Sequence, residues 1–143
     1  MKTKLTFLTH FLLMTVLCLS FSACTVEKAD EDVWAEATYI ENTELGKGQK
    51  TVSLEVVALD KSVTLTIHSD KSALGDALIE HKLIEGEKGA YGLYVKKVNG
   101  ITADYDENQC YWGLNKNGES VMTGVDGVVF EDGDHYEFVY TTP

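Results

Sequence analysis

The chain has 143 residues, and its 12 lysines and 23 acidic residues give a formal net charge of −11. This length predicts a single domain around one hydrophobic core. The sequence contains no arginine, so it lacks the forked guanidinium donor that reads phosphate and guanine, and we exclude nucleic acid as a partner. An anionic membrane surface would also repel the domain, so attachment to a membrane has to come from a covalent anchor.

Residues 1–23 have the pattern of a secretory signal peptide. Lys2 and Lys4 form a positive start, an apolar run extends from Leu5 to Phe21, and small residues follow it. The run is shorter and more polar than the ~20 apolar residues that a transmembrane helix needs. We therefore predict that this segment directs export and is then removed.

The end of the signal peptide predicts a lipid anchor. Ser22-Ala23-Cys24 resembles a bacterial lipobox, apart from Phe21 in place of the usual leucine. The resemblance implies cleavage before Cys24 and attachment of a diacylglycerol to its thiol, which would place the protein on the outer face of the bacterial cytoplasmic membrane. The alternative is an ordinary secreted protein that is cut near Ala23 and keeps Cys24 as a free thiol.

The chain after the cleavage site divides into a tether and a domain. Residues 24–32 are polar and acidic and predict a tether, and residues 33–143 predict the folded domain. Loss of Lys2 and Lys4 leaves ten lysines against 23 acidic residues, a net charge of −13. Cys110 is the only cysteine of the domain, so the fold has no intramolecular disulfide.

The first part of the domain predicts strands. Residues 33–40 indicate an edge strand. Thr51–Leu59 and Ser62–His68 alternate apolar and polar side chains and are rich in β-branched residues. With Asp60-Lys61 between them, these two strands predict a hairpin.

A helix follows the hairpin. Ser69 or Asp70 is a suitable cap for a helix that extends to about Glu80. Its buried stripe consists of Ala73, Leu74, Ala77 and Leu78. Gly86 and Gly89 end this segment.

Three more strands complete the domain. They are Leu93–Val98 before Asn99-Gly100, Cys110–Asn115 before Asn117-Gly118, and His135–Thr141 after Asp132-Gly133. Two strands, one helix and then three or more strands predict an α+β fold, a β-grasp-like mixed sheet with one packed helix.

An ordered series of motifs runs through residues 33–143. The series consists of Trp34, Tyr39, Leu45-Gly46, Gly48, Tyr91-Gly92-Leu93-Tyr94-Val95, Val98-Asn99-Gly100, Tyr111-Trp112, Gly118, Gly124-Val125 and Asp132-Gly133-Asp134. This series resembles the transcobalamin-like C-terminal domain. This family is the small β-grasp half of the vitamin carriers, and it occurs alone in many bacterial surface lipoproteins. In the carriers such a domain closes over one face of a corrinoid held by a larger helical barrel, which is absent from this sequence. The resemblance therefore implies contact with cobalamin or another corrinoid.

Aromatic residues near the later hairpins are the candidate ligand contacts. Tyr111 and Trp112 are neighbours in a strand, so if Trp112 is buried, Tyr111 is the more exposed and could stack on a flat ligand. Tyr91, Gly92 and Tyr94 belong to a glycine-containing loop beside the hairpins. We predict that these five residues form a binding site for an apolar, planar molecule.

The acidic loop after residue 103 is an incomplete cation motif. Asp104, Asp106 and Asn108 match the first positions of a calcium loop, but Gln109 and Asn115 stand where that loop needs glycine and a bidentate glutamate. We expect a solvated acidic loop with no metal.

The sequence predicts no enzyme. Cys110 would be a nucleophile only beside a histidine such as His135, and its alternative role is that of a small buried residue. We expect no catalytic residue, no metal ligand and no required cofactor.

Two functions remain open. One is a membrane-anchored module that binds a corrinoid or another flat small molecule and passes it to an importer. The other is a surface module that docks a partner protein through its sheet face or a strand edge. An aromatic-lined pocket near Tyr111 would favour the first, and a flat, exposed apolar face or a free strand edge would favour the second.

Overall fold

The computed structural model describes residues 32–143. The signal peptide of residues 1–23, the lipid site Cys24 and the tether up to residue 31 lie outside the described residues, and they stay predictions. In the described part of the chain, no helix combines the length and the hydropathy needed to cross a membrane.

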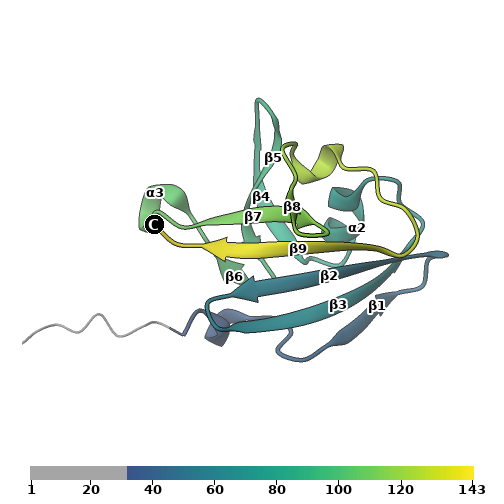
Figure 1. Cartoon of the computed structure of the whole chain (residues 1–143), viewed down its shortest axis with the longest axis horizontal. Helices are drawn as coiled ribbons and strands as arrows, with labels where there is room; N and C mark the ends of the chain where they lie inside the picture. Colours follow the sequence, from purple (N-terminus) through teal and green to yellow (C-terminus); the bar gives the residue numbers. More distant parts are fainter. Residues whose placement is uncertain (1–31) are drawn as a thin grey trace, which may run out of the picture. The chain divides into compact units, whose positions relative to one another are not determined.

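The larger of the two sheets in the domain is a six-stranded mixed sheet (Figure 1). Its strands are β1 (Thr43–Gly46), β2 (Lys50–Ala58), β3 (Lys61–Ser69), β7 (Tyr111–Lys116), β8 (Glu119–Ser120) and β9 (Asp134–Thr141). Their order across the sheet is β1-β3-β2-β9-β7-β8. The β1–β3 and β2–β9 pairs are parallel, and the other pairs are antiparallel.

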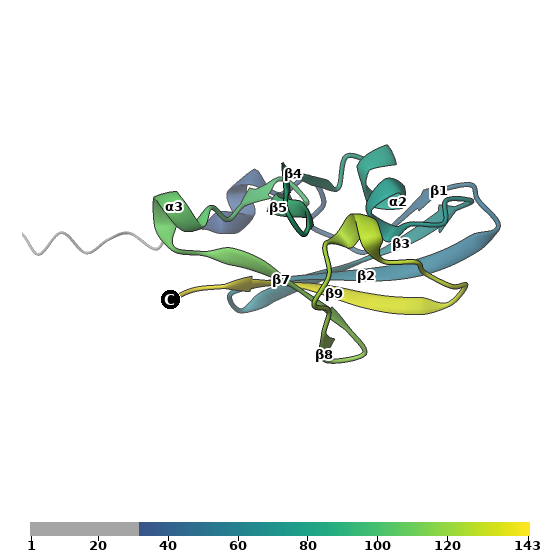
Figure 2. The same cartoon turned by 90° about the horizontal axis from the view of Figure 1, so that it is seen from above.

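A second layer lies on one side of this sheet. It contains a three-stranded antiparallel sheet made of β4 (Ile84–Gly89), β5 (Gly92–Val98) and β6 (Ile101–Thr102). The helical elements are η1 (Val33–Glu36), α2 (Leu74–Glu80), α3 (Tyr105–Asn108) and η2 (Val125–Gly127). Figure 2 shows α2 and the β4–β5 hairpin on one side of the long strands β2, β3 and β9.

The core fills the space between the two layers. Alternation along each long strand sends every second side chain inward, where it is buried, and leaves mostly Ser, Thr, Glu and His side chains on the outward face. The inward side chains of β2, β3, α2 and β9 include Val52, Leu54, Val56, Val63, Leu65, Ile67, Leu74, Ala77, Leu78, Tyr136 and Phe138.

The fold class is confirmed in its coarse form, because the described residues form a mostly β, mixed α+β domain with one helix longer than a turn. The prediction of a single sheet was wrong, because the strands divide between two sheets. Residues 84–89 do not end the helical segment but form β4, the outer strand of the second sheet. A bulge between Glu85 and Gly86 interrupts the alternation that would have identified this strand.

The edge strand predicted at residues 33–40 was also wrong. Asp32 caps the short helix η1 by accepting the N–H of Trp34 at 3.2 Å. The Trp34 side chain is buried, and its Nε1 donates to the Ala58 carbonyl at 2.9 Å. The true edge strand is β1, which pairs with β3.

The predicted helix begins later than expected. Ser69 is the last residue of β3, and its Oγ accepts the N–H of Lys71 at 3.2 Å. Asp70 accepts the N–H of Gln49 at 2.8 Å. Because both side chains are used in the turn after β3, the helix begins at Leu74.

The hairpin turns are largely where the sequence places them. Asn99-Gly100 and Asn117-Gly118 both have positive φ at both positions, as a type I′ turn requires. The β2–β3 turn is one residue earlier than predicted, at Leu59-Asp60, with φ of 56° at Leu59.

Candidate functional site

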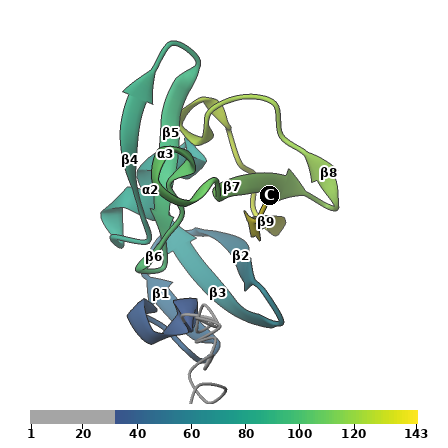
Figure 3. The same cartoon turned by 90° about the vertical axis from the view of Figure 1, so that its left-hand side faces the viewer.

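A cleft of about 500 Å³ lies between the β4–β5 hairpin and β7. Figure 3 shows this hairpin rising beside the six-stranded sheet. All five predicted contact residues line the cleft: Tyr91, Gly92, Tyr94, Tyr111 and Trp112. The fold therefore brings the Tyr91–Tyr94 segment next to Tyr111 and Trp112, as the sequence predicted. The role of these residues in binding stays a prediction.

Strand alternation determines which way the two aromatic residues of β7 face. Trp112 is 7% exposed, and its Nε1 donates to the Ile101 carbonyl at 3.2 Å. Its ring makes edge-to-face contacts with Phe138 and Tyr140, at centroid distances of 6.4 and 5.3 Å. Tyr111 faces the other way and is 42% exposed. Trp112 is thus part of the core as well as of the cleft wall, and Tyr111 keeps an accessible ring.

The hairpin that carries Tyr91 is fixed by η2. The Asp126 carboxylate accepts the N–H of Leu93 at 2.9 Å, and the N–H of Gly124 donates to the Tyr91 carbonyl at 3.3 Å. Gly92 has a φ of 109°, and a Cβ there would collide with the Asp126 carboxylate. Gly92 therefore has a structural reason for its identity, beside its place in the cleft wall.

The two hairpin tyrosines are strongly exposed. Tyr91 is 93% exposed and Tyr94 is 44% exposed. An aromatic ring that keeps so much apolar area in water is a ready platform for a flat ligand.

The segment from Ser120 to Val125 forms a third wall that sequence reasoning did not assign. It is held against β7 because the N–H of Val121 donates to the Leu114 carbonyl at 2.8 Å. The segment is irregular between β8 and η2, so it has no periodic pattern. Its only signal was Gly124-Val125, as one member of the motif series.

The cleft is uncharged. Among the described residues that line it, none is Asp, Glu, Lys or His, although the chain as a whole carries a net charge of −11. Its polar groups are tyrosine, serine and threonine hydroxyls and the backbone. The walls can therefore stack on a ligand and donate or accept neutral hydrogen bonds, but they offer no strong acid or base.

The hypothesis of a Cys110 nucleophile beside His135 was wrong. Cys110 is buried, and its Sγ donates to the Asn108 carbonyl at 3.4 Å. His135 lies at the opposite end of β9, about 20 Å away along the strand, because residue 141 is the one that pairs with Tyr111. Burial, and then the Cys110 thiol, raise the pKa of Tyr140 to about 12, so this phenol stays protonated near neutral pH.

The expected solvated acidic loop contains the short helix α3. Asp104 caps it by accepting the N–H of Asp106 at 3.0 Å, and it pairs with Lys96 at 3.1 Å. Lys96, followed by the Asp106 N–H, lowers the pKa of Asp104 below its ordinary value. The Asp104 carboxylate is thus paired with Lys96 and with the first turn of α3.

Comparison with known proteins places the chain in a family. A crystal structure of a "putative metal binding protein" from Ruminococcus gnavus is 32% identical, covers 66% of this chain and 99% of its own, and superposes with a TM-score of 0.62. Haptocorrin in complex with Cbi is 18% identical with a TM-score of 0.49, and covers 68% of this chain and 26% of its own. The curated proteins contain no match. The model of one family matches residues 71–142, half of the chain, and the chain therefore belongs to the family described as "Domain of unknown function (DUF4430)".

Proposed function

We propose that this protein is a lipid-anchored, non-catalytic binding module that holds a flat, largely apolar small molecule in the cleft between the β4–β5 hairpin and β7. The observation that carries the proposal is that three exposed tyrosines, Tyr91, Tyr94 and Tyr111, are among the residues that line one uncharged cavity. Its volume of about 500 Å³ falls within the range of small-molecule sites.

The chemistry of the walls supports a neutral ligand. An uncharged, apolar lining binds a charged group poorly, because that group would lose water without gaining a partner. The same lining supports a role without catalysis, since it contains no carboxylate, imidazole, amine or thiol. The description of the Ruminococcus gnavus relative supports binding as the general class, and we extend it to this chain no further.

Within this class we propose a corrinoid, such as cobalamin or cobinamide. The support is the sequence resemblance to the transcobalamin-like domain, whose motif residues Tyr91, Tyr94 and Tyr111 all lie at the cleft. A corrinoid is a wide, flat ring with amide arms, so the tyrosines would stack on one face and their hydroxyls would bond the amides. With one face covered, we expect a Kd that is micromolar or weaker, about −8 kcal/mol at best.

The alternative, a module that docks a partner protein, has less support. The outward face of the six-stranded sheet is mostly polar, and the two edge strands of this sheet, β1 and β8, are only four and two residues long. Short edges and polar faces are how sheets avoid pairing with other chains. Small-molecule binding therefore fits the domain better than strand addition does.

The test of the binding site is a titration of cobinamide and cobalamin, by calorimetry and NMR. We expect Tyr111→Ala to weaken binding at least tenfold without a change in melting temperature, because the ring is half exposed. The matched control is Tyr105→Ala, which removes a tyrosine that is 57% exposed but lies on α3 outside the cleft. Absence of shifts at millimolar corrinoid would reject this ligand class and favour the docking module. Equal losses in both variants would reject the site.

The lipid anchor is tested separately. Cys24→Ala should release the protein into the medium or leave it unprocessed, because the thiol is the proposed attachment point. Detergent-phase partitioning measures the outcome. A variant that still partitions like the wild type would contradict the anchor and leave the cleft proposal unaffected.

A further inference from the structure

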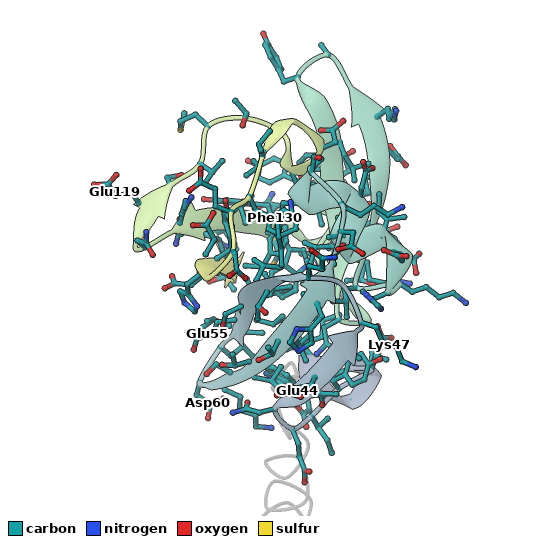
Figure 4. The ribbon with its side chains drawn as sticks, turned by 90° about the vertical axis from the view of Figure 1, so that its right-hand side faces the viewer. Glu44, Lys47, Glu55, Asp60, Glu119 and Phe130 are labelled. Carbon is teal, nitrogen blue, oxygen red and sulfur yellow. The ribbon has the colours of Figure 1, made fainter. Side chains whose placement is uncertain are left out.

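A cluster of metal-ligating side chains lies on the outward face of the six-stranded sheet, away from the cleft. It consists of Glu55 from β2 and His135 and Glu137 from β9. The parallel pairing of these strands places Glu55 opposite Glu137, and Ser53 opposite His135. Because side chains alternate between faces, all of these residues lie on the same face. Figure 4 shows Glu55 projecting from this sheet on the side away from the β4–β5 hairpin.

The three ligand atoms have nearly the spacing that one metal ion requires. His135 Nε2 lies 3.6 Å from Glu137 Oε1 and 3.8 Å from Glu55 Oε2, and all three atoms lie within 4.8 Å of one another. Ligands at ~2.1 Å from a tetrahedral zinc ion are about 3.4 Å apart. Small rotations of two flexible glutamate side chains would close the remaining difference.

A hydroxyl group orients the imidazole. His135 Nδ1 lies 3.2 Å from Ser53 Oγ, so the ring can donate its Nδ1–H to the serine and present Nε2 to the carboxylates. Metal-binding histidines usually have this arrangement, in which the second nitrogen donates to a neighbouring oxygen. It fixes both the tautomer and the ring orientation.

The electrostatics of the cluster favour a cation. Two carboxylates lie close together with their side chains only 31% and 26% exposed, and no lysine of the described residues pairs with either of them. Partial burial makes their mutual repulsion stronger than it would be in water. At 36% exposure the imidazole still admits an ion together with its remaining water ligands.

We propose that Glu55, His135 and Glu137 form a binding site for one divalent first-row transition-metal ion, with zinc as the probe. One imidazole nitrogen and two carboxylate oxygens suit such ions better than Mg²⁺ or Ca²⁺, which prefer oxygen ligands alone. Three protein ligands leave at least one position for water, so the site is open to exchange. The site is separate from the cleft and does not depend on the function proposed above.

The same sheet face offers a matched control. His68 of β3 also has its Nδ1 at 3.2 Å from a hydroxyl oxygen, that of Thr51, but it forms no ion pair with a carboxylate in the described part of the chain. Glu44 of β1 is a carboxylate on the edge strand outside the cluster. Substitutions at these two residues change the same side-chain types without touching the proposed ligands.

The experiment is a zinc titration of the full chain by calorimetry, repeated with cobalt to record its d–d absorption. We expect one ion per chain, and at least tenfold weaker binding in His135→Gln and in Glu55→Gln. We expect His68→Gln and Glu44→Gln to bind like the wild type. Melting curves recorded in chelator should be the same for all four variants, which shows that they fold.

Three results would overturn the proposal. They are no binding up to millimolar zinc, equal losses in the cluster and control variants, and binding that survives both His135→Gln and Glu55→Gln. The first would leave the cluster as a contact between a histidine and two glutamates on the sheet face. The last would place the ion elsewhere in the chain.

Discussion

The two Asn-Gly turns of this domain have the same backbone conformation and very different surroundings. Asn99-Gly100 joins β5 to β6 with φ of 52° and 85°, and Asn117-Gly118 joins β7 to β8 with φ of 51° and 81°. Asn99 is completely buried, whereas Asn117 and Gly118 are exposed. One dipeptide can therefore serve as a simple chain reversal or as a joint in the core.

Asn99 holds three segments together. Its N–H donates to the Leu83 carbonyl at 2.7 Å, and its own carbonyl accepts the N–H of Thr38 at 2.8 Å. Its side chain accepts the N–H of Tyr39 at 2.9 Å and donates to the Tyr39 carbonyl at 2.8 Å. The segment after η1 and the start of β4 are thus both tied to this turn. The Asn117 side chain makes no such bond to the described residues.

The largest expected effect is that of Asn99→Ala compared with Asn117→Ala. Loss of the Asn99 amide leaves the Tyr39 backbone groups without partners and forces alanine to a positive φ, so we expect a loss of at least about 3 kcal/mol in unfolding free energy. Asn117→Ala carries only the backbone cost, about 1 kcal/mol. Denaturant unfolding measures both. Glycine at each position is the control, because it removes the side-chain amide but adopts a positive φ without strain. Equal losses at the two sites would show that the Tyr39 bonds contribute nothing.

The next effect is the difference between Gly100→Ala and Gly118→Ala. Both glycines have positive φ, but a Cβ at Gly100 would collide with the Glu36 carbonyl, and a Cβ at Gly118 would meet nothing within 4 Å. We expect Gly118→Ala to cost about 1–2 kcal/mol for the backbone alone, and Gly100→Ala to cost at least about 1 kcal/mol more. If the two variants had the same denaturation midpoint, the η1 segment would have to move away from the new Cβ at residue 100 without cost.

The smallest effect concerns an ion pair beside each turn. Lys96 pairs with Asp104 at 3.1 Å, and Lys116 pairs with Asp134 at 2.7 Å. Burial alone would raise the pKa of Asp134, but the Glu131 N–H and Lys116 lower it by more, so the pKa falls below 3.8. A lowered folded pKa stabilises the protein above the unfolded value, and this stabilisation is lost as the pH falls through the folded pKa.

We therefore expect Asp134→Asn and Asp104→Asn to flatten the decline of stability below about pH 4. At neutral pH each variant should shift the denaturant midpoint much less than Asn99→Ala does, because ion pairs at the protein surface contribute little to stability even when they are partly covered. Unfolding curves recorded from pH 7 to pH 2 test this. If only one of these two variants lost much stability at neutral pH, the ion pairs, and not the Asn99 amide, would explain why the two turns differ.

The sequence predicted both turns and the alternating strands correctly. The predictions failed where a segment has no local pattern, or where a residue type suits two different local structures. Residues 84–89 contain two glycines and a bulge, so no period-2 pattern identified β4. Ser69 and Asp70 are good caps, but the turn after β3 uses them. The five cleft residues were found because aromatic and glycine motifs are visible in sequence. The wall from Ser120 to Val125 was missed because irregular backbone has no period.

The sequence by itself determined which side chains of each strand are apolar, where the chain reverses, and that the domain is acidic and free of disulfides. The tertiary structure decided which strands are neighbours. Ser53 and His135 are 82 residues apart, yet the parallel β2–β9 pairing places their side chains in contact and sets Glu55 opposite Glu137. It also decided that Asn99 is buried while Asn117 is exposed. The physical reason is that alternation and turn chemistry act over a few residues, whereas strand partners are chosen by packing the whole core.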